Sequence, residues 1–121
     1  MTPIETDIQD NFIRKATICY VVDGDTADAI IDLGFGITTK QRIRFELIDA
    51  PERGEEGYQE AKDFVTDLIL GKEVYLQTFK YKGGGWGRYM GWIYLPNEDG
   101  TLTNVSELVL QEGLAVVWKR K

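Results

Sequence analysis

The residues best suited to chemistry in this chain are an arginine and several carboxylates at the end of an alternating segment. Arg44 lies within that segment, and Asp49 and Glu52 follow where Pro51 ends it. A guanidinium beside carboxylates at a strand end is a combination typical of a binding or catalytic site. Glu52, three residues after Asp49, is a candidate general base or a metal ligand acting through water.

A second acidic turn, Asp-Gly-Asp-Thr at residues 23–26, adds Asp25 to this set. We expect the first and third strands to be neighbours, which would bring Asp25 next to Asp49. Two carboxylates, a backbone carbonyl and waters form a Ca²⁺-type site, and without a cation the two carboxylates would repel each other. The chain has no histidine, so any metal would be a hard cation held by oxygen.

Each of these residues also has an ordinary structural explanation. Asp-Gly is common in hairpin turns, and Glu52 sits in an acidic loop with Glu55 and Glu56. Arg44 fits a salt-bridge partner, and Arg88 fits a loop arginine with no further task. The joint occurrence of these residues is what favours a functional site.

The elements that must position them follow from hydrophobic periodicity. Alternation and β-branched content predict strands, while a spacing of three and four residues predicts helices with Gly stops. The sequence predicts strands at residues 12–22, 26–33, 40–48, 73–79 and 89–95, and helices at 58–70 and 104–112.

This order predicts the fold class. Three strands, a helix and two strands indicate an α+β protein with a partly open five-stranded OB-fold barrel, the helix lying between strands three and four. A short second helix is expected near the C-terminus. Residues 1–11 are expected to be a flexible lead-in and residues 12–121 a single domain. The fold alone does not establish a function.

Composition narrows the class of partner. The net charge is −6, with 6 basic and 13 acidic residues in 1–60 against 8 and 7 in 61–121. A bound divalent cation would offset part of the acidic half. A weakly basic rim in the second half can meet a phosphate chain with salt-sensitive affinity. Its members are Lys80, Lys82, Arg88, Lys119, Arg120 and Lys121.

The single Cys19 rules out an internal disulfide, and no apolar run is long enough to span a bilayer. We therefore expect a soluble monomer with no membrane partner. It is expected in the cytoplasm if the chain is complete as given, and outside the cell if a signal peptide was removed.

Three spaced motifs resemble the staphylococcal nuclease, or thermonuclease, family. They are residues 22–26 (Val-Asp-Gly-Asp-Thr), Arg44 with residues 49–52 (Asp-Ala-Pro-Glu), and residues 86–88 (Trp-Gly-Arg). Asn104 with residues 108–115 resembles that family's later helix. The resemblance runs from about residue 13 to residue 117, and its three motifs together are specific.

The resemblance implies a Ca²⁺ site made by the carboxylates of Asp25 and Asp49 and the backbone carbonyl of Ala50. The implied substrates are DNA and RNA, taken as single-stranded or frayed, and the implied reaction is hydrolysis of the P–O5′ bond. A phosphodiester is anionic, so a metal and arginines suit it.

The resemblance also assigns the remaining roles. Glu52 would orient or deprotonate the attacking water, and Arg44 and Arg88 would grip the phosphate and stabilise the five-coordinate transition state. Trp86 is expected to stack on a base, and Lys82 to bind substrate.

Two other functions remain open. One is a nuclease-like barrel that binds nucleic acid or a protein partner without cutting. The other is a scaffold completed by a helix from another chain. The presence of Arg44, Glu52 and Arg88 alongside both aspartates favours the enzyme.

Overall fold

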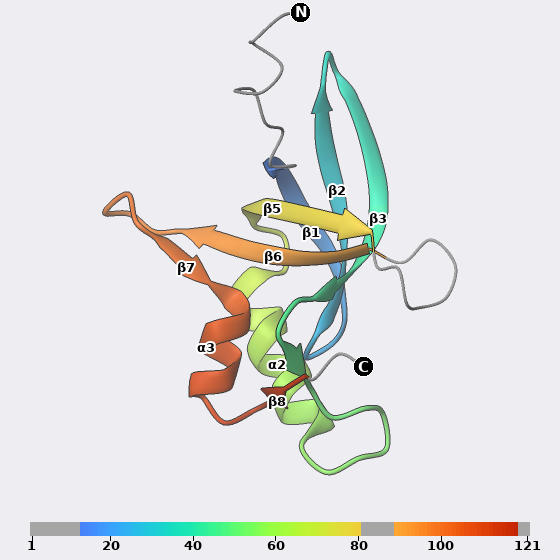
Figure 1. Cartoon of the computed structure of the whole chain (residues 1–121), viewed down its shortest axis with the longest axis vertical. Coiled ribbons are helices and arrows are strands. Elements are labelled where there is room, and N and C mark those ends of the chain that lie inside the picture. Colours follow the sequence, from blue (N-terminus) through green and yellow to red (C-terminus); the bar gives the residue numbers. More distant parts are fainter. Residues whose placement is uncertain (1–12, 81–88, 119–121) are drawn as a thin grey trace, which may run out of the picture.

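The chain folds as five long strands with two helices at one end, described for residues 13–80 and 89–118 of the computed structural model. The strands are β1 (Ile13–Asp23), β2 (Thr26–Gly34), β3 (Ile37–Phe45), β4 (Ile48–Asp49), β5 (Glu73–Lys80), β6 (Tyr89–Pro96), β7 (Leu102–Asn104) and β8 (Val116–Val117). The helices are α2 (Tyr58–Ile69) and α3 (Val105–Gln111). Figure 1 shows both helices on one side of the strands, with the β2–β3 hairpin rising on the other. The predicted lead-in lies outside the described residues.

The barrel closes because β3 has a partner on each side. It pairs antiparallel with β2, and parallel with β6 through a short register centred on Arg44 and Met90. The order β3-β2-β1-β5-β6 therefore returns to β3. The predicted OB-fold, with α2 between the third and fourth long strands, is confirmed. The barrel is closed rather than partly open.

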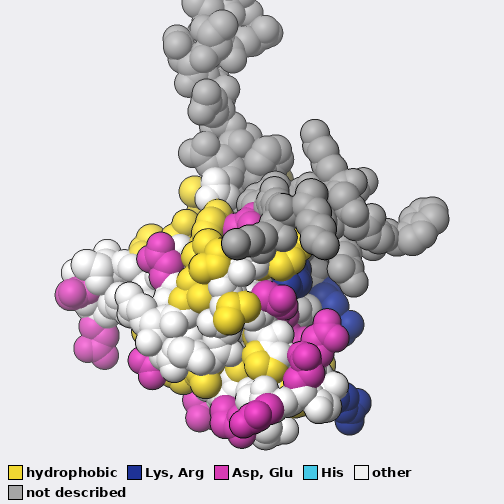
Figure 2. Space-filling view, turned by 60° about the horizontal axis from the view of Figure 1, so that its bottom comes forward, with side chains coloured by type: hydrophobic (Ala, Val, Ile, Leu, Met, Phe, Trp, Pro, Cys, Tyr) yellow, Lys and Arg dark blue, Asp and Glu magenta, His cyan; other side chains and the backbone are white. Residues whose placement is uncertain are grey.

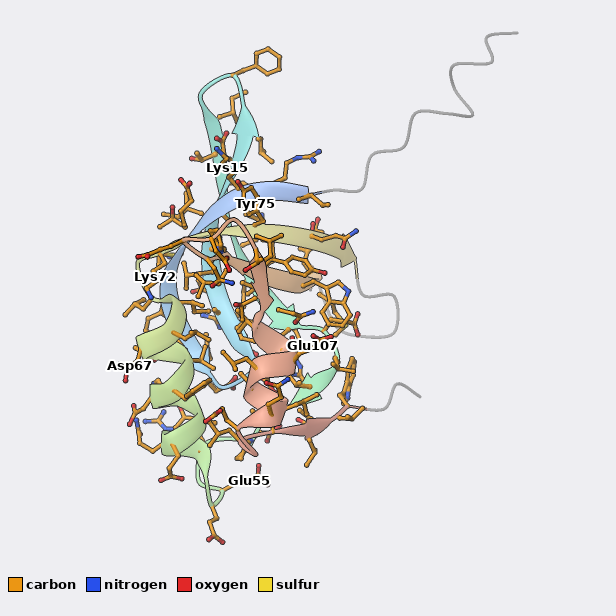
Figure 3. The ribbon with its side chains drawn as sticks, turned by 90° about the vertical axis from the view of Figure 1, so that its left-hand side faces the viewer. Lys15, Glu55, Asp67, Lys72, Tyr75 and Glu107 are labelled. Carbon is orange, nitrogen blue, oxygen red and sulfur yellow. The ribbon has the colours of Figure 1, made fainter. Side chains whose placement is uncertain are left out.

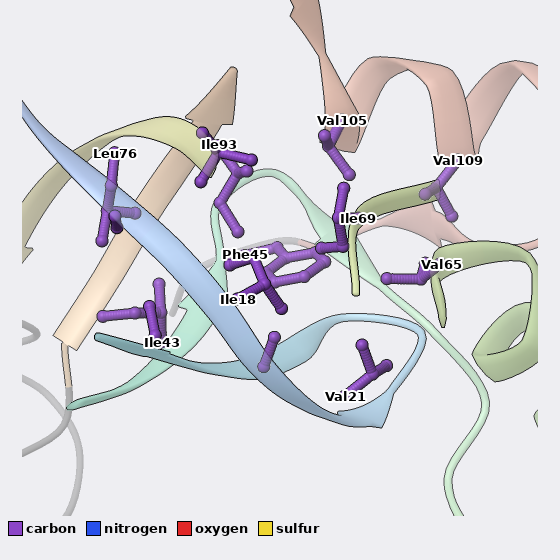
Figure 4. Packing of buried hydrophobic residues seen from close by; sticks show 14 of the residues in the cluster. Ile18, Val21, Ile43, Phe45, Val65, Ile69, Leu76, Ile93, Val105 and Val109 are labelled. Atoms are coloured by element: carbon purple, nitrogen blue, oxygen red, sulfur yellow. The ribbon is translucent and has the colours of Figure 1, made fainter. Parts of the chain in front are cut away.

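The core fills the space between the barrel and the two helices. Phe45 is completely buried, and Figure 4 shows its ring between side chains of the strands and of α2. Helix α2 contributes Ala61, Val65 and Ile69 at helical spacing, which is the apolar stripe that the periodicity predicts. The Gly71 N–H donates to the Ile18 carbonyl at 2.7 Å and ties the end of this helix to β1.

The predicted third strand, residues 40–48, is wrong at its end. β3 stops at Phe45 because Leu47 adopts a positive φ of 80°, which a sheet ladder does not accommodate. Pairing resumes in β4, which lies antiparallel to β8. The sequence analysis missed β4, β7 and β8, each of which is only two or three residues long.

The β2–β3 hairpin extends past the barrel. Ala27, Ala29 and Ile31 are buried as their alternation predicts, but Leu33 is 47% exposed. The alternating pattern continues beyond the barrel wall, where the described residues no longer cover the apolar side chains. The pattern alone therefore does not predict that Leu33 is exposed.

The predicted cap of the second helix is confirmed. The Asn104 side chain accepts a hydrogen bond from the Glu107 backbone N–H at 3.3 Å. Among the described residues, no helix combines the length and apolar character needed to cross a bilayer.

An ion pair across β2 and β3 makes stability depend on pH. Both Arg42 Nε and Nη2 donate to the Asp28 carboxylate, at 2.8 and 3.2 Å, and these bonds lower the pKa of Asp28 from 3.8. A lowered pKa means that the pair stabilises fully above pH 3.8, and that the stabilisation is lost as the pH falls through the lowered value.

We expect Asp28→Asn to reduce the free energy of unfolding at pH 7 by about 1 kcal/mol, because Arg42 is 62% exposed and solvent weakens the pair. Urea unfolding at pH 7 and pH 3 measures the difference in free energy of unfolding between the native protein and the variant. This difference should be smaller at pH 3. Asp32→Asn, an exposed change on the same strand, is the matched control. An equal difference at both pH values would contradict a stabilising Asp28–Arg42 ion pair.

Candidate functional site

Asp25 is a buried carboxylate held by its own turn. Its exposed fraction is 6%, and its Oδ1 accepts a hydrogen bond from the Thr26 hydroxyl at 2.8 Å. Its Oδ2 accepts from the Ala50 N–H at 2.8 Å, and its backbone carbonyl accepts from the Phe45 N–H at 2.7 Å. The turn is therefore joined to both β3 and the segment after β4.

Arg44 lies between the two predicted metal-binding carboxylates. Its Nη1 is 2.6 Å from Asp25 Oδ2, and its Nη2 is 3.6 Å from Asp49 Oδ1. One guanidinium thus touches both groups, and the structure brings Asp25, Asp49, Ala50 and Arg44 together.

The route by which the two aspartates meet differs from the prediction. β1 and β3 are not neighbours, because β2 lies between them in the sheet. Thr26 of β2 pairs with Arg44 of β3, so the turn before β2 faces the end of β3. The expectation that the first and third strands adjoin is therefore wrong, although Asp25 and Asp49 still converge on Arg44.

The contact between Arg44 and Asp25 is close, but it is not aligned as a hydrogen bond. Arg44 Nη1 is buried and lies 2.6 Å from Asp25 Oδ2, yet it makes no aligned hydrogen bond with any described residue. The contact is therefore mainly ionic. An arginine in this position supplies positive charge to both carboxylates.

Glu52 lies in the wall of an open groove of about 670 Å³. Asp49 and Ala50 line the same groove, and residues 113–116 line it from another part of the chain. Glu52 is exposed, and its backbone N–H donates to the Glu55 carboxylate at 2.6 Å. Figure 3 places Glu55 in the loop that precedes α2. Glu52 therefore shares one groove with Asp49 and Ala50, whereas Asp25 does not line it.

Arg88, Trp86 and Lys82 lie outside the described residues. The nearest described residue after them is Tyr89, which pairs with Ile43 at the start of the β3–β6 register. Their predicted roles stay predictions.

Negative charge is crowded at the β1–β2 turn. Burial first, and then the neighbouring Asp25 carboxylate, raise the pKa of Asp23 from 3.8 to about 6. The Asp25 N–H also donates to the Asp23 carboxylate at 3.1 Å. The sequence analysis treated Asp23 as a turn residue only, because an Asp-Gly pair carries no signal of this burial.

The oxygen donors fit a hard cation such as Ca²⁺. The oxygen donors that the resemblance implies are the Asp25 and Asp49 carboxylates and the Ala50 carbonyl. The structure brings both carboxylates to Arg44 and the Ala50 N–H to Asp25. In the described part of the chain, no three acidic, histidine or cysteine side chains are grouped closely enough to hold a metal by themselves. A cation here would therefore complete its coordination with water or substrate oxygens, as Ca²⁺ commonly does.

Trp118 is part of this site, and its role did not emerge from the sequence. Its ring centroid is 5.1 Å from Arg44 Cζ, and its backbone N–H donates to the Leu47 carbonyl at 2.6 Å. The only sequence signal was the apolar character of residues 114–118.

Gly24 allows the turn to approach the helix. A Cβ placed there would lie 2.7 Å from the Ala61 Cβ and 2.9 Å from the Ala50 Cβ, closer than carbon atoms pack. The glycine is therefore required by packing between the turn, α2 and the Asp25–Ala50 contact.

The fold and the site together define a class of protein. It is a closed OB-fold barrel in which two carboxylates, Asp25 and Asp49, and the Arg44 guanidinium meet at one edge. Such a site suits a substrate whose negative charge needs both a metal and a guanidinium.

Comparisons with known proteins identify the family. Residues 42–121 match the family described as "Staphylococcal nuclease homologue". A "Micrococcal nuclease" of Shigella flexneri is 30% identical over 111 residues, which is 87% of this chain and 59% of that protein. Two proteins called "Uncharacterized endonuclease", from Escherichia coli O157:H7 and Escherichia coli, are each 33% identical over 106 residues, 85% of this chain and 60% of theirs.

The chain belongs to the staphylococcal nuclease homologue family, as its motifs predict. It spans about three fifths of the length of the curated relatives it matches.

We expect Gly24→Ala to lower the free energy of unfolding by about 1–3 kcal/mol, because neither alanine that it would meet has a flexible side chain to move. Urea unfolding of the variant measures this loss. Ala61→Gly in the same chain removes the nearer contact and should restore part of the stability, despite the cost of glycine in a helix. If the double variant loses more free energy of unfolding than the two single variants lose together, the packing explanation is contradicted.

Proposed function

We propose that this protein is a Ca²⁺-dependent phosphodiesterase that hydrolyses the P–O5′ bond of DNA and RNA. The observation that carries the proposal is the Arg44 guanidinium in contact with both the Asp25 and Asp49 carboxylates, next to the groove that contains Glu52. The names of the relatives, a micrococcal nuclease and two endonucleases, support the same chemistry.

Asp25, Asp49 and the Ala50 carbonyl would hold the cation. When bound, Ca²⁺ supplies positive charge that draws in the phosphodiester and offsets the charge developing on its oxygens. Asp25 is prepared for this role because Thr26 and Ala50 each donate to one of its oxygens and fix its plane.

Glu52 acts as the general base in this mechanism. It accepts a proton from the water that attacks phosphorus, and a P–O bond to that water forms. The P–O5′ bond breaks, and the departing O5′ takes a proton from solvent water to leave as a hydroxyl. An exposed carboxylate in an open groove can be reached by water from solvent. Glu52 lines the same groove as Asp49 and Ala50, so it would lie near the phosphate that the cation would hold.

Arg44 and Arg88 bind the phosphate oxygens and stabilise the transition state. A planar guanidinium offers paired donors that match two oxygens of one phosphate. Arg44 presents its edge at the cation site, and Arg88 precedes Tyr89, whose partner Ile43 adjoins Arg44 in β3. Trp86 would stack on a base and Lys82 would contact the backbone of a single-stranded or frayed substrate, bound by a monomer.

The acidic surface supports the alternative function, a barrel that binds a partner without cutting it. Figure 2 shows Asp and Glu side chains spread over the helix-bearing end, with Lys and Arg gathered on one side. The groove itself is lined by Asp49, Glu52, Glu55 and Glu56 and by no basic described residue. A barrel that binds a partner without cutting is therefore the alternative, and a cleavage assay separates the two.

The deciding experiment is digestion of single-stranded DNA with Ca²⁺ and then with a chelator. We expect cleavage with Ca²⁺ and none after chelation. In the same assay Glu52→Gln should lower kcat by about 100-fold or more while leaving nucleotide binding largely intact, since only proton transfer is lost. Glu56→Gln, in the same groove, is the matched control and should retain native turnover. Equal activity of Glu52→Gln and the native protein would remove Glu52 as the base.

Replacing either arginine by lysine should also reduce turnover. Arg44→Lys and Arg88→Lys keep the positive charge and lose the paired donors, so we expect kcat to fall by about tenfold or more. Steady-state kinetics with a defined single-stranded oligonucleotide measure the effect. Native turnover in either variant would take that arginine out of the catalytic set.

A further inference from the structure

Arg44 is in contact with an aromatic ring as well as with a carboxylate. Its guanidinium edge meets Asp25, and the centroid of the Trp118 ring lies 5.1 Å from its central carbon. The Arg44 side chain is only 20% exposed, so little water separates these groups. A cation over an indole face is attracted by the ring's quadrupole, most strongly when it is desolvated.

The backbone fixes the indole relative to the site. Val117 pairs with Ile48 in the β4–β8 ladder, and the next residue, Trp118, donates its N–H to the Leu47 carbonyl at 2.6 Å. Leu47 is the residue of positive φ that ends the β3 ladder. The segment that carries Trp118 is therefore attached to the same short strand that carries Asp49.

The two contacts on Arg44 do not compete. An aromatic ring engages the face of a guanidinium and leaves its N–H groups in the plane unoccupied. The Arg44 nitrogens meet oxygen atoms instead, with Nη1 at 2.6 Å from Asp25 Oδ2 and Nη2 at 3.6 Å from Asp49 Oδ1. Two different contacts therefore restrict where the guanidinium can lie.

We propose that Trp118 is a positioning residue for Arg44. Its indole holds the guanidinium in place so that its N–H groups stay beside Asp25 and Asp49, where the phosphate would bind. This inference rests on the proposed phosphodiesterase function. Without the indole, Arg44 would remain charged and near Asp25, but it would lose the orientation that lets it bind transition-state oxygens.

Steady-state kinetics on single-stranded DNA with Ca²⁺ test the proposal through Trp118→Leu and Trp118→Phe. We expect Trp118→Leu to lower kcat by about 3- to 30-fold, the range that corresponds to a cation–π contact, with little change in KM. Trp118→Phe should lose less because a benzene ring still attracts the cation. Val117→Ala, the neighbouring change in β8, is the control and should retain native kcat.

Two kinetic outcomes would overturn the proposal. A rise in KM at native kcat would assign Trp118 to base stacking. An equal loss in Val117→Ala would show that the variants act by releasing β8.

A measurement without substrate separates this inference from the proposed function. Urea unfolding of the metal-free native protein, Trp118→Leu, Arg44→Met and the double variant forms a double-mutant cycle. We expect Trp118→Leu to raise the unfolding equilibrium constant several-fold when Arg44 is present. The same change should raise it by a clearly smaller factor when Arg44 is already Met. If the two substitutions have additive effects on the free energy of unfolding, Trp118 does not stabilise Arg44 and the proposal is overturned. If the native protein cleaves nothing with Ca²⁺, the proposed function fails, while this cycle still decides whether Trp118 holds Arg44.

Discussion

The ion pair between Arg44 and Asp25 is the contact on which the site depends. Asp25 is almost completely buried, and a buried carboxylate is costly unless a positive group accompanies it. The guanidinium of Arg44, 2.6 Å away, supplies that charge in the protein alone. A bound Ca²⁺ would supply it in the functional state that we propose, so the metal and the arginine act on the same carboxylate oxygens.

Several local structures serve to bring these two residues together. The pairing of Thr26 with Arg44 sets the turn against the end of β3. Gly24 lets that turn lie against Ala61 of α2 and against Ala50, where any side chain would push them apart. The site is thus supported by the packed helix and not by loops alone, which favours a precise geometry.

The acidic groove constrains how the substrate that we propose could bind. Its walls would repel a phosphate chain, so affinity would have to come from the few groups that concentrate positive charge at one point. In the proposed function, a cation between Asp25 and Asp49 and the Arg44 guanidinium would provide such a point. The contact of Arg44 with Trp118 keeps this charge in place without adding another charged group.

Local sequence determined much of this protein. Periodicity located the five long strands and both helices, and Asn104 marked a helix start. The motifs that contain Asp25, Arg44, Asp49 and Glu52 indicated the family. These features depend on neighbouring residues, which is why they can be read along the chain.

Only the tertiary structure decided how these parts meet. The parallel β3–β6 pair, the positive φ at Leu47, the contact of Gly24 with α2 and the stacking of Trp118 on Arg44 all join residues distant in sequence or depend on such contacts. Periodicity reports which face of an element is buried but not what covers it. For that reason the sequence predicted the groups at the site and could not predict the route that assembles them.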